Sequence, residues 1–131
     1  MNPQRKKTKV TLKTTATDDC DRHYKFNIEF YVFVENGQNI AHCPSLDLST
    51  VGATFNDAVS AFYECFQLYI EACVDSGTLL DDLAAHGWKA SRHTLRAPSF
   101  TALMKKPELK RLVNSGIGFE KIVAPAQIAL A

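Results

Sequence analysis

The chain has 131 residues, a formal net charge of +1, 46% hydrophobic residues and 22% charged residues. These values are ordinary for a single globular domain and exclude collagen-like, low-complexity and largely disordered chains. No apolar run approaches the roughly 18 residues that span a bilayer, and the basic residues after Met1 lack the apolar stretch of a signal peptide. We therefore expect a cytoplasmic protein with reduced cysteines and no membrane contact.

The charge is distributed unevenly along the chain. Residues 1–13 hold five basic residues and no acidic one, residues 14–98 hold twelve acidic and five basic residues, and residues 99–131 hold five basic and two acidic residues. We divide the chain into a basic arm at 1–21, a core domain at 22–98 and a C-terminal extension at 99–131. An acidic body favours a basic partner, although an uneven solvated surface explains the same pattern.

The first predicted elements are extended. The alternation of Val10 and Leu12 in the basic arm leaves two interpretations, a frayed arm, which we favour, or a short outer strand. From Tyr24 to Val34 the residues alternate with the two-residue period of a strand that has one buried face.

Two more strands should follow. Asn36-Gly37 suits a two-residue hairpin loop, so residues 39–43 are expected to return as a second strand. Pro44 ends that pairing, and residues 48–53 are rich enough in β-forming residues for a third strand. The opening is therefore predicted to be a three-stranded antiparallel meander.

A long helix is expected to begin after Thr54, which can cap the first turn together with Asp57, and to end at Ser76-Gly77. Its apolar arc is wider than a surface helix needs, so the helix should pack on the sheet and present its flanks to another surface. Self-association is the simplest use of those flanks. Tyr63 and Leu68 are the candidate residues for it.

A shorter helix is expected from its cap at Thr78 to about His86, with Gly87 ending it. Residues 88–95 are predicted to form a fourth strand. The chain is therefore assigned to the α+β class, as a three-stranded antiparallel meander followed by a long helix and a further strand.

The C-terminal extension is expected to hold short helices and an extended end. Ser99 should cap a helical stretch that is interrupted at Pro107 and resumes to Asn114. Residues 119–130 read as extended, and Pro125 confines them to an edge or an irregular strand.

No motif predicts catalysis. Cys20 and His23 have a spacing that zinc can use, but no second pair completes a site, and Cys65 and Cys73 have the spacing of core thiols. The chain offers no nucleophile elbow, and the lone Gly52 before a helix is better explained by backbone geometry than by phosphate binding. We therefore expect no catalytic residue, metal or cofactor, and no enzyme activity.

An ordered combination of a turn, a proline, a Gly-x-Thr cap and a long helix runs from Phe30 to about Trp88. Its segments are Phe30-Tyr31-Val32-Phe33-Val34-Glu35-Asn36-Gly37, Ile40-Ala41-His42-Cys43-Pro44-Ser45-Leu46 and Val51-Gly52-Ala53-Thr54-Phe55-Asn56-Asp57-Ala58. The combination covers somewhat under half of the chain and resembles the HicB-type antitoxin family of bacterial toxin-antitoxin systems. The resemblance implies a compact β-β-β-α-β core, similar to a reduced ribonuclease H fold without its nuclease carboxylates.

The resemblance also implies binding and inhibition of a small basic RNA-cleaving HicA-type toxin, often with operator DNA binding by a separate C-terminal segment. Residues 99–131 depart from that pattern, because two short helical pieces are too little for a helix-turn-helix. The alternative is a stand-alone oligomeric module, a dimer or larger, that contacts nucleic acid through its basic ends. The basic candidates are Arg5, Lys6, Lys7, Lys105, Lys106, Lys110 and Arg111.

Acidic residues on the two predicted helices are the candidates for contact with a basic toxin. They are Glu64, Glu71, Asp75, Asp81 and Asp82. Ordinary solvated helix faces explain these acids as well, and core packing explains Tyr63 and Leu68.

Overall fold

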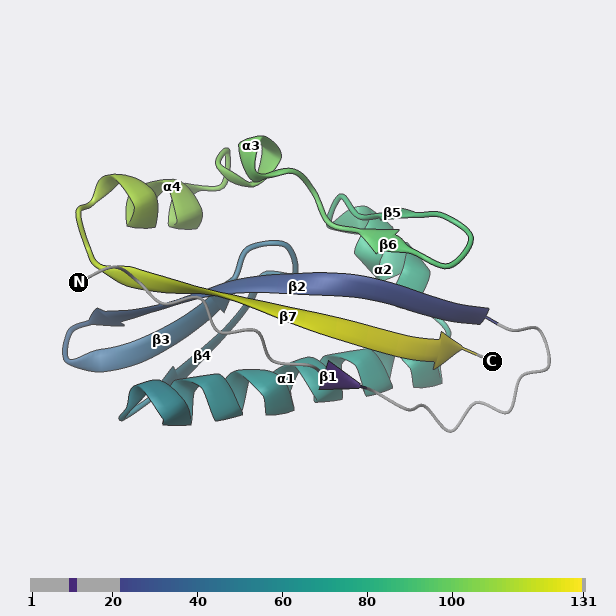
Figure 1. The fold of residues 1–131 in the computed structure, drawn as a ribbon, viewed down its shortest axis with the longest axis horizontal. Helices are drawn as coiled ribbons and strands as arrows, with labels where there is room; N and C mark the ends of the chain where they lie inside the picture. The colour runs from purple at the N-terminus through teal and green to yellow at the C-terminus, as the bar shows by residue number, and fades with distance from the viewer. Residues whose placement is uncertain (1–9, 12–21, 131) are drawn as a thin grey trace.

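The computed structural model describes residues 10–11 and 22–130 and shows an α+β fold built on one large sheet (Figure 1). The sheet has the order β1-β7-β2-β3-β4, in which β1 pairs in parallel with β7 and the other pairs are antiparallel. Its strands are β1 (Val10–Thr11), β2 (Arg22–Glu35), β3 (Gln38–Cys43), β4 (Leu48–Gly52) and β7 (Phe119–Leu130). The helices are α1 (Phe55–Ser76), α2 (Leu79–Ala85), α3 (Phe100–Leu103) and α4 (Pro107–Asn114).

The predicted meander is confirmed. β2, β3 and β4 pair in succession, and Asn36 and Gly37 both have a positive φ, at 53° and 76°, as the tight turn between β2 and β3 requires. Of the N-terminal arm, only Val10 and Thr11 are described, and they form the short outer strand that was the less favoured interpretation. The rest of the predicted arm lies outside the described residues.

The long helix is also confirmed. The Thr54 hydroxyl accepts a hydrogen bond from the Asp57 amide at 3.1 Å, and Gly77 ends α1 in the left-handed conformation. Gly52 lets β4 approach the helix closely, because a Cβ at this position would lie 2.4 Å from the Ala58 amide nitrogen. The geometric interpretation of this glycine is therefore the correct one.

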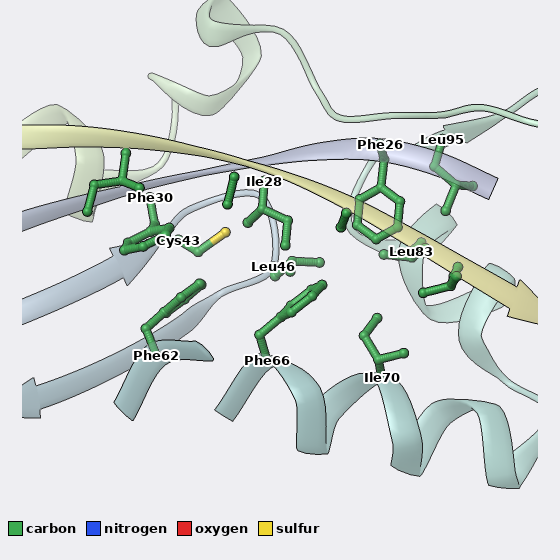
Figure 2. Packing of buried hydrophobic residues seen from close by; sticks show 14 of the residues in the cluster. Phe26, Ile28, Phe30, Cys43, Leu46, Phe62, Phe66, Ile70, Leu83 and Leu95 are labelled. Carbon is green, nitrogen blue, oxygen red and sulfur yellow. The ribbon is translucent and has the colours of Figure 1, made fainter. Parts of the chain in front are cut away.

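The main core lies between the sheet and α1 (Figure 2). Alternate residues of β2, from Tyr24 to Val32, face this layer and are buried. The rings of Phe30 and Phe62 stack with their centroids 4.1 Å apart, and Phe26 packs edge-on against Phe66. Burial of each large apolar side chain contributes roughly 1.5–3 kcal/mol, so this interlayer packing is the main stabilising term.

The expectation that β2 has only one buried face is wrong for its second half. Tyr31 and Phe33 point to the opposite face of the sheet and are buried there with Leu109 and Leu112 of α4. We call this side the α4 face of the sheet. Figure 1 shows α1 below the sheet and α3 and α4 above it, so the sheet is the middle of three layers.

The strand predicted at 88–95 is wrong. In its place, two short strands, β5 (Lys89–Ala90) and β6 (Leu95–Arg96), form a separate two-stranded sheet. The further strand of the main sheet is β7, which pairs with β2 from Arg22–Leu130 to Phe33–Phe119. The sequence signal at 88–95 was misleading because the turn between β5 and β6 reverses the chain before a longer strand can form.

Thr78 precedes α2 without a side-chain capping hydrogen bond, so its predicted capping role is wrong, whereas Ser99 caps α3 by accepting from the Ala102 amide at 3.2 Å. Pro125 lies on the side of β7 that faces β1. β1 pairs with that side only at Ala126 and Gln127. None of the helices in the described part of the chain is long and apolar enough to cross a membrane.

Candidate functional site

One side of α1 forms a continuous exposed surface that faces away from the sheet. We call it the acidic stripe, and its members are Asp57, Glu64, Leu68, Glu71 and Asp75. Their spacing of seven, four, three and four positions places them on one side of the helix, opposite Phe62, Phe66 and Ile70 in the core. At 1.5 Å per residue the stripe is about 27 Å long.

The acidic stripe has no nearby positive charge in the sequence. Residues 26–88 contain nine acidic residues and no lysine or arginine. Glu71 accepts a hydrogen bond from the side-chain amide of Gln67 at 3.1 Å, and no basic side chain among the described residues pairs with its charge. Glu71 and Asp75 are also four positions apart, a like-charge spacing that costs a few tenths of a kcal/mol in an exposed helix. A basic ligand on this surface would therefore relieve a repulsion that the isolated chain carries.

Leu68 lies at the centre of the acidic stripe and is 59% exposed. Glu64 precedes it by one turn and Glu71 follows it by one turn, so an apolar centre is flanked by carboxylates. Protein interfaces commonly have this arrangement of an apolar centre and a polar rim. Of the two candidates for self-association, only Leu68 is exposed in this way.

Tyr63, the other candidate, lies on the flank of α1 and packs against the core. Its ring is edge-on to those of Phe30 and Phe62, with centroids 5.7 Å and 6.3 Å away. The Tyr63 hydroxyl is buried and has no hydrogen-bond partner among the described residues. Tyr63 and Leu68 therefore do not share one surface.

The two acidic candidates on α2 differ from each other. Asp81 is exposed, whereas Asp82 is partly buried and accepts a hydrogen bond from the Tyr69 hydroxyl. Burial, followed by the Asp82 carboxylate, raises the pKa of Tyr69. Asp82 also lies 3.6 Å from Nδ1 of His86. It is therefore engaged inside the molecule, and of the five acidic candidates it is the least free to meet a partner.

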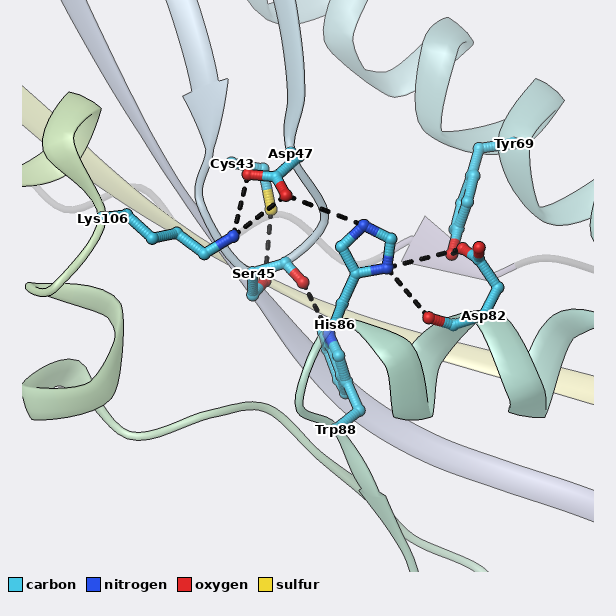
Figure 3. A network of polar contacts seen from close by, with 8 residues as sticks. All are labelled: Cys43, Ser45, Asp47, Tyr69, Asp82, His86, Trp88 and Lys106. Atoms are coloured by element: carbon cyan, nitrogen blue, oxygen red, sulfur yellow. Dashed lines mark hydrogen bonds and ion pairs between the residues drawn. The ribbon is translucent and has the colours of Figure 1, made fainter.

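Asp82 belongs to a polar network that joins α2 to the β3–β4 turn and to the segment before α4 (Figure 3). His86 lies between Asp82 and Asp47, with Nε2 3.7 Å from Oδ2 of Asp47. Asp47 also accepts from the Lys106 ammonium group at 2.9 and 3.0 Å. Sequence reasoning missed this network because its members come from separate elements and no local spacing connects them.

A groove of about 560 Å³ opens on the α4 face of the sheet, between α4 and strands β3 and β4. Two ion pairs, Lys106–Asp47 and Arg111–Glu35, contribute to its walls. His42 and Ser49 also line it, with Nδ1 of His42 2.6 Å from Oγ of Ser49. Burial lowers the pKa of His42, which favours the neutral imidazole.

Among the described residues, the His42–Ser49 pair lacks the third group that a nucleophilic triad needs. Nε2 of His42 is buried and has no hydrogen-bond partner among the described residues, so no carboxylate orients the ring as a catalytic triad requires. The described residues contain no cluster of three His, Cys, Asp or Glu side chains that could hold a metal ion. The cysteines Cys43, Cys65 and Cys73 are free thiols, and Cys20 lies outside the described residues.

The basic candidates fall into three groups. Arg5, Lys6 and Lys7 lie outside the described residues. Lys106 and Arg111 are paired with Asp47 and Glu35. Lys105, two residues before α4, and Lys110, within α4, are exposed on the side of the sheet opposite α1. Among the described residues, the exposed side of α1 is therefore acidic, and exposed lysines lie on the α4 side.

No protein-family model, curated protein or solved structure matches this chain.

Proposed function

We propose that the chain is a cytoplasmic HicB-like antitoxin-type protein, which neutralises a small basic HicA-type RNA-cleaving toxin by direct association. The observation that carries the proposal is the acidic stripe, a row of carboxylates around the exposed Leu68 that form no ion pair with other described residues. The order of three strands and a long helix, which the HicB-type resemblance implies, supports it. The proposal assigns no catalytic step to the chain.

The stripe suits a basic protein partner for two physical reasons. Its carboxylates attract positive charge over the length of α1 and so accelerate encounter, while Leu68 offers an apolar contact that is independent of charge. Surface charges are screened within about 8 Å at physiological ionic strength, so binding should weaken as salt is added. Because the apolar contact that Leu68 offers does not depend on salt, part of the affinity for the partner should remain at high salt.

The resemblance implies that a small basic toxin is encoded beside the gene, and co-expression with that expected protein tests the proposal. We expect the wild-type chain to restore growth, to copurify with that protein and to block its RNA cleavage. The triple variant Glu64→Lys, Glu71→Lys and Asp75→Lys should lose all three effects, because it reverses the charge of the stripe without touching the core.

The matched control reverses charge on the other side of the molecule. Lys105→Glu and Lys110→Glu change two exposed residues, one just before α4 and one within it, and should leave neutralisation intact. A triple stripe variant that protects cells as well as the wild type would contradict the proposal, as would a neighbouring protein that never copurifies.

The second candidate is a stand-alone oligomeric module that contacts nucleic acid. The observation in its favour is the exposure of Lys105, just before α4, and Lys110, within α4. Electrophoretic mobility shifts at low salt with random DNA and RNA test it, since phosphate contacts are strongest there. Retention by the wild type and loss in the Lys105→Glu, Lys110→Glu variant would support this candidate, and no retention would eliminate it.

A further inference from the structure

The two edges of the large sheet differ in their protection against pairing. The β7 side carries Glu120, Lys121 and Pro125 and is partly covered by β1. Charged side chains, prolines and covering segments are the devices that keep exposed strands from pairing with other chains. At the other edge β4 reads Leu48-Ser49-Thr50-Val51-Gly52, which contains no charge and no proline.

The outer edge of β4 is open to pairing within the part of the chain that the structure describes. Among the described residues β3 is the strand that pairs with β4, and the Val51 side chain is 52% exposed. β4 continues directly into the loop that leads to α1, and Gly52 holds it against that helix, so the edge is rigidly presented. An uncharged and rigid edge with an exposed valine is a template for a further strand.

The register shows which main-chain groups point outward. Glu35 and Gln38 flank a two-residue loop and therefore form a hydrogen-bonded pair. Because main-chain groups alternate sides along a strand, even-numbered residues of β3 face β2 and odd-numbered residues face β4. The odd-numbered residues of β3 pair with even-numbered residues of β4. Ser49 and Val51 consequently direct both N–H and C=O away from the sheet.

We propose that β4 pairs in antiparallel fashion with β4 of a second copy of this chain, about a two-fold axis at Thr50. The outward groups of Ser49 and Val51 are symmetric about Thr50, so Ser49 of each copy meets Val51 of the other, and each such pair exchanges two hydrogen bonds. The two sheets then form one continuous sheet across the axis.

The chemistry of the edge selects a second copy over a basic partner. Two uncharged strands meet without like-charge repulsion, whereas a basic protein finds no carboxylate on β4. Val51 is in register with Ile40, which is in register with Phe33, so these three side chains form an apolar row on the α4 face. In the proposed dimer, Val51 of the second copy lies next to Ser49 on the α4 face. Ser49 lines the groove on that face.

Sedimentation velocity of the full chain from about 5 to about 500 µM tests the proposal, because an edge of this length supports only weak association. We expect a reversible monomer–dimer equilibrium that persists in 0.5 M NaCl, since no charge lies on the pairing strand. Val51→Lys should raise the dimer dissociation constant about tenfold or more, because it places a charge on the edge. A monomer at every concentration would overturn the proposal.

Val34→Lys is the matched control. Val34 is 55% exposed, similar to Val51, but lies near the end of β2, just past its last pair with β7, and β3 separates it from β4. This variant should dimerise like the wild type. A dimer that survives Val51→Lys, or that is lost equally in Val34→Lys, would mean that association uses another surface, and it would overturn the proposal.

Hydrogen exchange of the wild type provides a test that needs no variant. The amides of Ser49 and Val51 should exchange quickly in dilute solution and become protected as concentration rises, while the inward-facing amide of Thr50 should be protected throughout. Protection at Ser49 and Val51 that does not depend on concentration would contradict pairing between copies. Because β4 and the acidic stripe lie on different elements, this result is independent of toxin binding.

Discussion

The ammonium group of Lys106 lies 2.9 Å from Oδ1 of Asp47, although 59 positions separate the two residues. The contact joins the residue that precedes α4 to the turn between β3 and β4, and so holds the layer on the α4 face against the sheet (Figure 3). Asp47 has a φ of 53°, in the left-handed region that few residues other than glycine adopt readily. The anchoring point of this layer is therefore also a conformationally demanding position.

Substitutions at Asp47 should separate the contribution of its backbone conformation to stability from the contribution of its ion pair. Asp47→Ala loses the ion pair and places a Cβ-bearing residue without a polar side chain in the left-handed region, so it should cost about 1–2 kcal/mol. Asp47→Gly loses the same ion pair but adopts the left-handed backbone conformation readily. Its free energy of unfolding should therefore stay within about 0.5 kcal/mol of the wild-type value. Urea unfolding measures both values. Equal losses in the two variants would show that φ contributes nothing.

Phe62→Ala should destabilise the protein by about 3–5 kcal/mol, because it removes a fully buried ring stacked on Phe30. Leu68→Ala, six positions further along the same helix, should stay within about 0.5 kcal/mol because its side chain is exposed. Thermal and chemical unfolding of the two variants provide the comparison. Similar losses would contradict the orientation of α1 on the sheet.

Gly52→Ala should cost about 1–3 kcal/mol, because the added methyl group collides with main-chain atoms of Asp57 and Ala58 and separates β4 from α1. Gly118→Ala is the control, since a Cβ there meets nothing within 4 Å. The free energy of unfolding of each variant checks the prediction. A neutral Gly52→Ala variant would mean that β4 and α1 are not held at this distance.

His42 should make the protein less stable in acid. Burial lowers the pKa of its imidazole in the folded state below the ordinary value of 6.5, while nearby Glu108 and Asp47 oppose this shift and Lys106 adds to it. The unfolded chain therefore binds the proton more tightly. The stability that His42 contributes is fully present above pH 6.5 and is lost as pH falls through the lowered pKa.

Unfolding measured from pH 7.5 to about pH 5 in His42→Asn checks this prediction. The variant should lose less stability than the wild type across that range. Parallel curves for wild type and His42→Asn would show that His42 does not carry the acid sensitivity.

Local signals account for the parts of the fold that were predicted correctly. Asn36-Gly37 fixes a tight turn, Thr54 caps α1 and Gly77 ends it, and each of these acts within a few residues of the chain. The candidate surface on α1 could be predicted from the sequence for the same reason, because helical spacing alone places Glu64, Leu68 and Glu71 on one side.

The parts that were missed depend on contacts between distant segments. The burial of Tyr31 and Phe33 requires α4, which lies more than 70 positions later in the sequence. Their alternation with Val32 on the other face was compatible with two buried faces, but nothing local distinguished an exposed aromatic side from a covered one. The network around Asp47 and His86 has no sequence signal for the same reason.

The placement of β7 next to β2 has a consequence for the order in which the protein is made. β2 is among the earliest described segments and β7 is the last, yet they pair along twelve positions in the middle of the main layer. A nascent chain on the ribosome therefore carries an incomplete sheet until residues 119–130 have emerged, with Phe26, Ile28 and Phe30 lacking a neighbour on one side. The time before residues 119–130 emerge should therefore determine how strongly the nascent chain depends on chaperones and how readily it aggregates.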